Sequence, residues 1–276
     1  MHYHNNTFEP SLLSGITNKD KKYIVRKSRM KKNKFILLIL PLVLICIGVA
    51  IPVYNYYAPA SERSAYTCQQ HQDDTLRLAM IGDSWVFNHY PYNDTLASMI
   101  RQIIKKPTIV SAYGLCGKTS KEVYQSIFED QTMRNILEKG TDYCFVSVGI
   151  NDTYKKMGAK YYAQNSINIL RFLLKNNIKP ILLEIPNYDI NYAYEHQTAD
   201  RKLFRQLSML LTRSELDCRQ EYRQALAHEL VKTSIGEQIQ IIHFPGTLEY
   251  YKSDRMHLNE KGYHILDSCI ANEIHP

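Results

Sequence analysis

The sequence is poor in the residues that mark several common classes of protein. Among its 276 residues there are 11 glycines, 10 prolines and one tryptophan, too little glycine and proline for a fibrous or disordered chain. The six cysteines form no CxxC pair, so no zinc site is indicated and neither a metal nor a cofactor is expected. The length fits one catalytic domain with an appendage.

Beyond its first 34 residues the chain also lacks an excess of charge of either sign. The net charge of +7 comes from nine Lys and Arg residues in this first segment, opposed only by Glu9 and Asp20. The remainder carries 25 basic and 25 acidic residues. Sites for polyanions need clustered Lys and Arg, so nucleic acid is not an expected partner.

A long apolar run follows the basic segment directly. Residues 35–53 comprise nineteen positions without a charged side chain, a length that predicts one transmembrane helix. Tyr54, Tyr56 and Tyr57 come next, as in the aromatic belt at a membrane interface. The positive charge on the N-terminal side predicts that residues 1–34 form a cytoplasmic tail, and that the catalytic domain lies on the periplasmic or extracellular side of a single-pass protein.

A cleaved signal peptide is the alternative to a retained anchor. Ala58-Pro59-Ala60 resembles a cleavage site, but the basic and apolar stretches both exceed those of usual signal peptides, which favours a signal-anchor. Outside the apolar run, which contains Cys46, five cysteines remain. An oxidising compartment permits a disulfide, for example between Cys218 and Cys269, although spacing cannot decide its connectivity.

After a juxtamembrane linker over residues 54–73, the pattern over residues 74–276 predicts an α/β domain. Short β-rich runs alternate with longer segments of helical period, which is typical of a parallel sheet covered by helices. Strands are expected at 76–81, 108–112, 143–148, 179–185 and 238–243. Helices are expected at 93–105, 119–138, 160–176, 200–233 with a break, and 259–272, the last opened by Asn259 as N-cap.

Ligand sites in such sheets lie beyond the carboxyl ends of the strands. Four segments at these ends carry polar residues: Gly82-Asp83-Ser84 after the first strand, Gly114 to Thr119 after the second, Gly149 to Asp152 after the third, and Asp254 to Asn259 near the C-terminus. Each motif alone is weak, because such residues are common in turns. Their shared position at one edge of the sheet indicates a single site.

In this order the four motifs resemble the blocks of the SGNH/GDSL serine hydrolase family, over about residues 76–272, with DRMHLNEKGY at 254–263 as the most specific match. The resemblance implies a flavodoxin-like three-layer fold with a five-stranded parallel sheet. It also implies Ser84 as nucleophile, His257 as base and Asp254 as its partner, with an oxyanion hole from the Ser84 N–H, the Gly117 N–H and the Asn151 amide. Ala112 and Lys118 depart from the usual second block.

The residue types suit acyl transfer independently of the family. A serine hydroxyl becomes a good nucleophile when an imidazole takes its proton, and a carboxylate on the other ring nitrogen stabilises the imidazolium. Asp254 lies three residues before His257. Uncharged N–H donors such as the Asn151 amide can stabilise an oxyanion. Asp83 is expected to brace the turn beside Ser84 rather than to react.

Two other classes of function remain as alternatives. Ala112 to Thr119 has the spacing of a phosphate-binding loop, but its first glycine is replaced and no acidic magnesium ligand ends the next strand, so a nucleotide-binding protein is the remote reading. A binding module without catalysis would be expected to have lost Ser84 or His257. An α/β-hydrolase elbow needs Gly-x-Ser-x-Gly, which is absent around Ser84.

The substrate follows less directly from the sequence. The resemblance implies ester-linked acyl groups, and a domain tethered outside a membrane meets envelope or exported polysaccharide. We therefore expect an esterase for O-acetyl groups of carbohydrate, working with other polysaccharide-modification proteins; an O-acyltransferase with the same site, or a lipase or thioesterase, is the alternative. Tyr188, Tyr192 and Tyr194, in the loop over residues 187–200, are candidates to stack on sugar rings.

Overall fold

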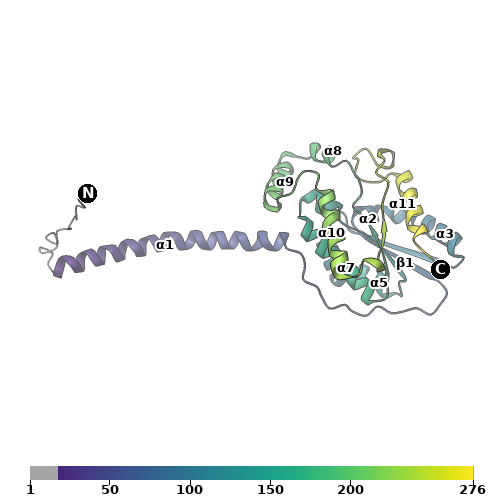
Figure 1. The fold of residues 1–276 in the computed structure, drawn as a ribbon, viewed down its shortest axis with the longest axis horizontal. Coiled ribbons are helices and arrows are strands. Elements are labelled where there is room, and N and C mark those ends of the chain that lie inside the picture. Colours follow the sequence, from purple (N-terminus) through teal and green to yellow (C-terminus); the bar gives the residue numbers. More distant parts are fainter. Residues whose placement is uncertain (1–17, 276) are drawn as a thin grey trace, which may run out of the picture. The chain divides into compact units, whose positions relative to one another are not determined.

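The computed structural model describes residues 18–275 and divides the chain into two compact units, Met1–Tyr56 and Tyr57–Pro276. Helix α1, Asn18–Tyr57, provides the described part of the first unit (Figure 1). Its segment Ile39–Tyr57 is long and apolar enough to cross a membrane. The predicted apolar run 35–53 lies within α1, whereas residues 1–17 of the predicted basic tail lie outside the described residues.

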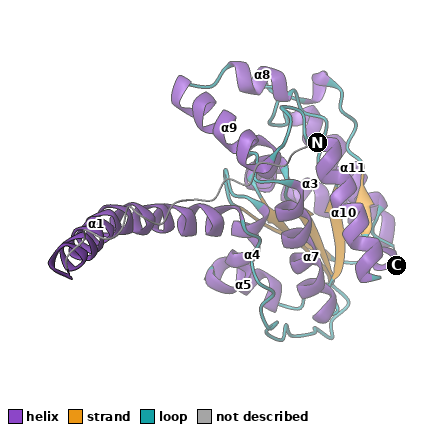
Figure 2. Cartoon of the chain, turned by 60° about the vertical axis from the view of Figure 1, so that its left-hand side comes forward, coloured by secondary structure: helices purple, strands orange, loops and turns teal. Residues whose placement is uncertain are grey.

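The second unit is an α/β domain in which strands and helices alternate (Figure 2). Its strands are β1 Leu76–Gly82, β2 Thr108–Gly114, β3 Tyr143–Ser147, β4 Lys179–Leu183 and β5 Gln240–Ile242. Its helices are α2 Ser84–His89, α3 Asn93–Ile104, α4 Ser120–Glu129, α5 Gln131–Glu138, α6 Ile150–Lys155, α7 Ala159–Lys175, α8 Ile190–Glu195, α9 Ala199–Thr212, α10 Arg219–Thr233 and α11 Glu260–Asn272.

The five strands form one parallel sheet in the order β2-β1-β3-β4-β5. β1 lies between β2 and β3, so the chain reverses its direction of travel across the sheet there, and crevices for ligands open at such points. Gly82, the last residue of β1, is in register with Gly114 of β2 and Ser147 of β3. The segments that follow these strands therefore start from the same edge.

Side chains alternate between the two faces of the sheet and build two separate cores. Ala79 and Ile81 pack into the core shared with α4, α5, α7 and α10, whereas Leu78 and Met80 pack into the core shared with α2, α3 and α11. Figure 1 shows α3 and α11 on one side of the strands and α5, α7 and α10 on the other. The result is the three-layer arrangement expected from the sequence.

Helix boundaries follow from local capping. The segment 119–138, expected as one helix, is two helices, because the Asp130 side chain accepts hydrogen bonds from the N–H groups of Thr132 and Met133 at 2.8 and 3.1 Å and starts α5 there. The predicted cap at Asn259 is confirmed: its side chain accepts a hydrogen bond from the Gly262 N–H at 2.9 Å.

The segment between α1 and β1 has no helix or strand, yet it is bound along the domain. The Ala60 N–H donates to Asn165 Oδ1 at 2.9 Å, and the Cys68 N–H donates to Asn176 Oδ1 at 2.7 Å. Between these points the Glu62 carboxylate accepts hydrogen bonds from Arg171 and Lys175. Side chains on α7 and at its C-terminal end thus hold the segment predicted as a linker.

Candidate functional site

The strand-to-helix turn after β1 presents Ser84 as the first residue of α2. Asp83 caps this helix, accepting from the Trp85 N–H at 3.0 Å and from Ser147 Oγ at 3.1 Å. Gly82 is required because a Cβ there would lie 2.2 Å from the Ser147 carbonyl oxygen. The close approach of β1 and β3 therefore fixes the turn that carries the serine.

Asp83 is fully buried, and burial raises the pKa of its carboxyl group to about 7. Its Oδ2 atom has no hydrogen-bond partner among the described residues. Both hydrogen bonds to Oδ1 come from groups that shape the turn, which fits the bracing role expected for Asp83. Its side chain contributes to the placement of Ser84 rather than to proton transfer.

The structure brings Ser84, His257 and Asp254 together, although 173 positions separate the serine from the histidine. His257 Nε2 lies 3.0 Å from Ser84 Oγ, and His257 Nδ1 lies 2.7 Å from Asp254 Oδ2. With Nδ1 protonated and donating to the carboxylate, Nε2 is free to accept the serine proton. The three side chains form a continuous hydrogen-bonded chain suited to activating a hydroxyl.

The Asp254–His257 loop is a tight turn that holds the carboxylate in place. Asp254 Oδ1 accepts from the N–H groups of Met256 and His257 at 3.0 and 2.9 Å. Burial raises the pKa of Asp254, but the hydrogen bonds from the His257 ring and from these two N–H groups outweigh it, so the pKa lies below its usual value. Asp254 is therefore ionised at neutral pH, as a partner for an imidazolium must be.

Two contacts attach this loop to its surroundings. The Trp85 indole N–H donates to the Met256 carbonyl at 3.0 Å, which ties the loop to the helix that carries Ser84. Arg255, in the left-handed conformation at φ 54°, donates to Asp189 Oδ2 at 2.9 Å, and the Asp189 N–H donates back to the Arg255 carbonyl at 3.1 Å. The histidine is thus positioned from both α2 and the segment before α8.

Asn151 supplies an unused donor near the start of α6. Its side chain is 8% exposed, and its Nδ2 has no hydrogen-bond partner within the part of the chain that is described. A buried amide without a partner is costly in a folded protein unless a ligand uses it. The Asn151 amide therefore has a free donor, which keeps it a candidate for the predicted oxyanion hole.

The other two predicted donors are backbone N–H groups. Ser84 begins α2, and the first N–H groups of a helix have no partner within it. Gly117 has φ 71°, and a Cβ added to it would meet nothing within 4 Å, so the loop borders open space. The Lys155 ammonium group donates to the Gly117 carbonyl at 2.6 Å and connects this loop to α6, the helix of Asn151.

Asp152 is a buried residue whose structural role the sequence did not reveal. Its carboxylate accepts from the Ser120 N–H at 2.9 Å and from Ser120 Oγ, which joins α6 to the start of α4. Burial raises its pKa to about 6. The hydrogen bonds place Asp152 between the Gly117 and Asn151 segments, so it supports the site without facing it. The only available signal was its position directly after Asn151.

The loop expected as a phosphate-binding alternative is folded around its own side chains. Thr119 Oγ1 and the Glu122 carboxylate form a reciprocal capping box at the start of α4. Lys118 donates to Glu122 at 2.9 Å. The groups that would serve a nucleotide are engaged within the helix terminus, which weighs against that reading.

A pocket of about 420 Å³ opens beside the histidine loop. Its lining comes from α6, α8 and that loop: Tyr154, Tyr192, Ala193, His196, Ser253, Asp254, Met256 and His257. The Tyr192 and His196 rings stack with centroids 3.9 Å apart, and the Arg255 guanidinium lies 4.3 Å from the Tyr192 centroid. The Arg205 guanidinium lies 3.7 Å from the Tyr154 centroid, so each of the two tyrosines already contacts another side chain through its ring, and only the remaining ring surface faces the pocket.

Only one of the three tyrosines singled out in the sequence lies in this pocket. Tyr192 does, whereas Tyr188 is 1% exposed with its hydroxyl bonded to Thr153, so the expectation of a stacking role for Tyr188 is wrong. Tyr194 lies outside the lining and accepts a hydrogen bond from Gln206. Tyr154 also lines the pocket, although nothing in the sequence pointed to it.

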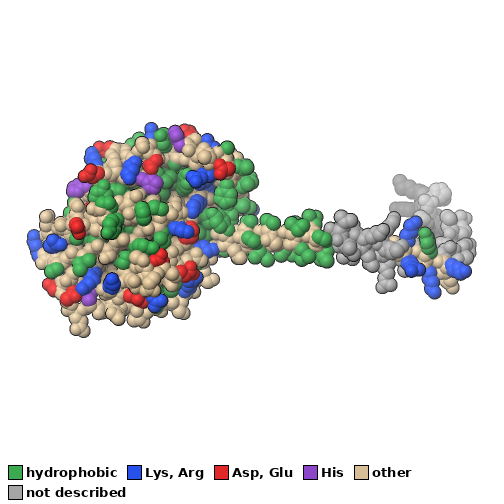
Figure 3. Space-filling model, turned by 180° about the vertical axis from the view of Figure 1, so that it is seen from behind, with side chains coloured by type: hydrophobic (Ala, Val, Ile, Leu, Met, Phe, Trp, Pro, Cys, Tyr) green, Lys and Arg blue, Asp and Glu red, His purple; other side chains and the backbone are tan. Residues whose placement is uncertain are grey.

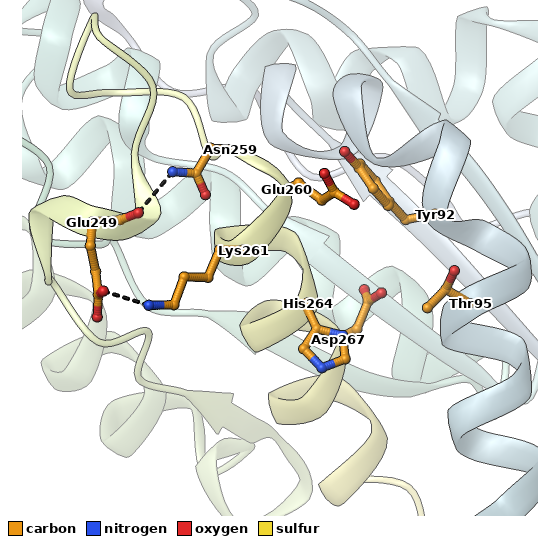
Figure 4. Close-up of a pocket in the computed structure, with 8 residues that line it drawn as sticks. All are labelled: Tyr92, Thr95, Glu249, Asn259, Glu260, Lys261, His264 and Asp267. Carbon is orange, nitrogen blue, oxygen red and sulfur yellow. Dashed lines mark hydrogen bonds and ion pairs between the residues drawn. The ribbon is translucent and has the colours of Figure 1, made fainter.

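A larger pocket of about 600 Å³ contains none of the predicted triad (Figure 4). It lies between the start of α11 and the segment that contains Tyr92 and the first turn of α3, and Lys261 donates there to the Glu249 carboxylate. Beneath it His89 Nε2 and Asp267 Oδ1 form a buried hydrogen bond of 2.6 Å that the sequence did not indicate. Because the larger pocket contains no member of the predicted triad, the smaller pocket beside His257 is the better candidate for the functional site.

Metal and disulfide chemistry find no support among the described residues. No group of three His, Cys, Asp or Glu side chains in residues 18–275 could hold a metal ion. All six cysteines are free thiols. Cys218 belongs to the core on one face of the sheet and Cys269 packs against the core on the other, so the disulfide considered from the sequence does not form.

Comparisons with known proteins find likeness in structure but not in sequence. No protein-family model matches the chain, and no curated protein matches it. A lipase/acylhydrolase from Enterococcus faecalis matches with TM-score 0.50 and 15% identity, over 72% of this chain and 95% of its own. The lipase Lip_vut3 from a goat rumen metagenome matches with TM-score 0.50 and 12% identity, over 71% and 96%. At such identities the likeness concerns the fold alone, and it confirms the predicted one: the domain has the α/β fold with a five-stranded parallel sheet that is typical of SGNH hydrolases.

Proposed function

We propose that this chain is a serine esterase that works through an acyl-enzyme, with Ser84 as nucleophile. The observation that carries the proposal is the hydrogen-bonded chain Ser84–His257–Asp254 beside the orphaned amide of Asn151. The first part generates a nucleophile, and the second stabilises the charge that the nucleophile creates. The fold agrees with this reading.

The reaction has two steps. Ser84 Oγ attacks the acyl carbon while His257 Nε2 takes the hydroxyl proton, and the N–H groups of Ser84 and Gly117 together with the Asn151 amide stabilise the oxyanion. Collapse expels the alcohol, which receives the proton from His257 and leaves an acyl group on Ser84. Water then attacks this ester and gives a proton to His257. Collapse of the second intermediate breaks the bond to Ser84 Oγ, which takes the proton back from His257, and the acid is released.

For the substrate we propose O-acetyl groups on envelope or exported carbohydrate. Tyr154, Tyr192 and His196 line the pocket beside His257, and apolar ring surface of this kind can pack against a sugar ring. The apolar segment Ile39–Tyr57 supports a single-pass anchor with the domain on the outer side. A sugar hydroxyl replacing water in the second step would make the same site an O-acyltransferase, and lipase or thioesterase activity would use the same acyl-enzyme.

The test is hydrolysis of a nitrophenyl acetate by the full chain in detergent. We expect Ser84→Ala and His257→Ala each to lower kcat by about 10⁴-fold or more. His243→Ala is the matched control, since His243 is exposed, bonded to Glu184 and outside the site. Loss of activity in both variants but not in the control supports the esterase; full activity in Ser84→Ala would refute it. A folded wild-type chain that hydrolyses no ester yet acetylates an added glycan would favour the acyltransferase.

A further inference from the structure

Helix α9 exposes apolar side chains and buries polar ones, the reverse of the usual pattern of a surface helix. Only Arg205 and Ser208 are buried in it, whereas four leucines point outward with exposed fractions of 51–76%. These four, Leu203, Leu207, Leu210 and Leu211, are here called the leucine face. Their spacing of three and four residues gathers them on one side of the helix. Figure 3 shows a green apolar area at the edge of the domain where α9 lies.

Such a surface indicates a binding partner. Isolated exposed leucines are ordinary, but a contiguous apolar stripe on a helix whose polar side is buried marks a contact with another protein or with lipid. The buried polar side makes a specific contact with the domain: the Arg205 guanidinium lies 3.7 Å from the centroid of the Tyr154 ring in α6. The outward direction of the leucines is therefore built into the packing of α9.

The contact between α9 and Tyr57 indicates which partner the leucine face has. Tyr57, the first residue of the domain, forms a hydrogen bond of 2.7 Å with Ser208 on α9. Tyr57 is also the last residue of the apolar segment that could cross a membrane. A chain that leaves a bilayer at Tyr57 must therefore have α9 next to its point of exit, where tyrosines favour the interface.

The charges on the helix agree with a lipid surface. Arg201 and Lys202 lie in its first turn and Arg213 directly follows its end, against Asp200 as the acidic residue within it. Basic residues beside an apolar stripe are typical of helices that lie in the plane of the membrane interface, where they meet anionic lipid head groups.

We propose that the leucine face of α9 is a membrane-docking surface that lies in the interface of the bilayer that holds the anchor. The proposal rests on the proposed membrane anchor and is independent of the esterase activity. Because the buried side of α9 contacts Tyr154 in the pocket beside His257, docking also holds the pocket close to the membrane surface. The substrates within reach are then those presented at that surface.

Tryptophan fluorescence tests this in the full chain reconstituted in phosphatidylcholine vesicles with brominated acyl chains. The single native tryptophan, Trp85, is fully buried and gives a constant background. Leu211→Trp places an indole on the leucine face, and Ile103→Trp places one at an exposed position of α3, outside that face. We expect the added emission to be blue-shifted and quenched by bromine for Leu211→Trp and to be neither for Ile103→Trp.

The remaining outcomes contradict the proposal in distinguishable ways. A chain that an alkaline carbonate wash removes from the vesicles overturns the anchor and the docking surface together. A retained chain in which both variants are quenched equally overturns the docking surface alone. A blue shift for Leu211→Trp without quenching means that a second copy or a protein partner covers the face, and this too overturns the proposal. Retained ester hydrolysis in each variant confirms that the domain is folded.

Discussion

Asn151 combines burial with an unused donor, which separates it from the other buried asparagines. We expect Asn151→Ala to lower kcat by roughly 100 to 1,000-fold with little loss of thermal stability, because no hydrogen bond within the protein is lost. Asn165→Ala is the control: Asn165 accepts from the Ala60 N–H and donates to the Tyr161 carbonyl, so its loss should lower Tm and leave kcat unchanged. Steady-state kinetics with melting curves check both. A normal kcat in Asn151→Ala removes it from the oxyanion hole.

Asp83 gives the stability of the domain a pH dependence of known sign. Its folded pKa of about 7 exceeds the ordinary value of 3.8, so the folded state binds the extra proton between these values. The stabilisation is present below about pH 4 and is lost as the pH rises toward 7. Asp83→Asn keeps an acceptor for the Trp85 N–H but cannot ionise, so we expect its free energy of unfolding to fall less between pH 5 and 8.

Chemical denaturation at both pH values measures this difference. Asp152, whose pKa is raised to about 6, contributes a dependence of the same sign and remains in the variant. The comparison between wild type and Asp83→Asn is therefore the informative quantity. An identical fall in both proteins would mean that Asp83 is already ionised in the folded state at pH 5, so that its pKa is not raised.

At the scale of elements, the connection from β3 to α6 requires glycine at position 149. Gly149 has φ 107°, and a Cβ there would lie 2.6 Å from Tyr162 and 2.7 Å from Ile185. We expect Gly149→Ala to destabilise the domain by about 2 kcal/mol or more, from overpacking and backbone strain together. Gly158→Ala is the matched control, since φ is 96° there but the nearest atom is 3.6 Å away. Equal losses in denaturant titrations would show that packing at the site is not restrictive.

Helix α8 brings Tyr192 to the pocket, and we propose that its ring contributes to substrate binding. We expect Tyr192→Ala to raise KM for an acetylated sugar several-fold, the loss of about one stacking contact, and to leave nitrophenyl acetate hydrolysis unchanged. Tyr194→Ala serves as control, because Tyr194 lies outside the pocket. If KM for the sugar ester is unaffected, the aromatic surface is not a sugar site.

The strands were the most predictable elements, and the short helices the least. All five strands were expected within a few residues of their observed bounds, because buried parallel strands are continuous apolar runs. Helices α2, α6 and α8 have six residues each, too few for an apolar period to stand out. Two of them carry Ser84 and Asn151, which were found from motif order instead. The Arg255–Asp189 contact and the position of Tyr154 in the pocket depend on tertiary packing, so no pattern in the sequence could predict them.

At the scale of the whole molecule, the orientation across the membrane can be tested through its cysteines. In the domain Cys116 is exposed, whereas Cys68, Cys144 and Cys218 are buried. If the domain lies outside the membrane, an impermeant maleimide should label intact cells at Cys116. Labelling should disappear in the double variant Cys116→Ser/Cys269→Ser, since Cys269 is partly exposed and Cys46 lies within the apolar segment. Labelling only after the cells are broken would place the domain in the cytoplasm.

The segment that follows α1 is hydrogen-bonded to the domain instead of extending freely from it. A free chain over residues 58–75 could extend to about 60 Å, at roughly 3.3–3.6 Å per residue. Contacts to Asn165, Asn168 and Asn176 hold the stretch from Ala60 to Cys68 against the domain instead. This stretch is therefore not a free tether. With the membrane anchor that we propose, we expect the domain to act only on substrates close to the membrane surface.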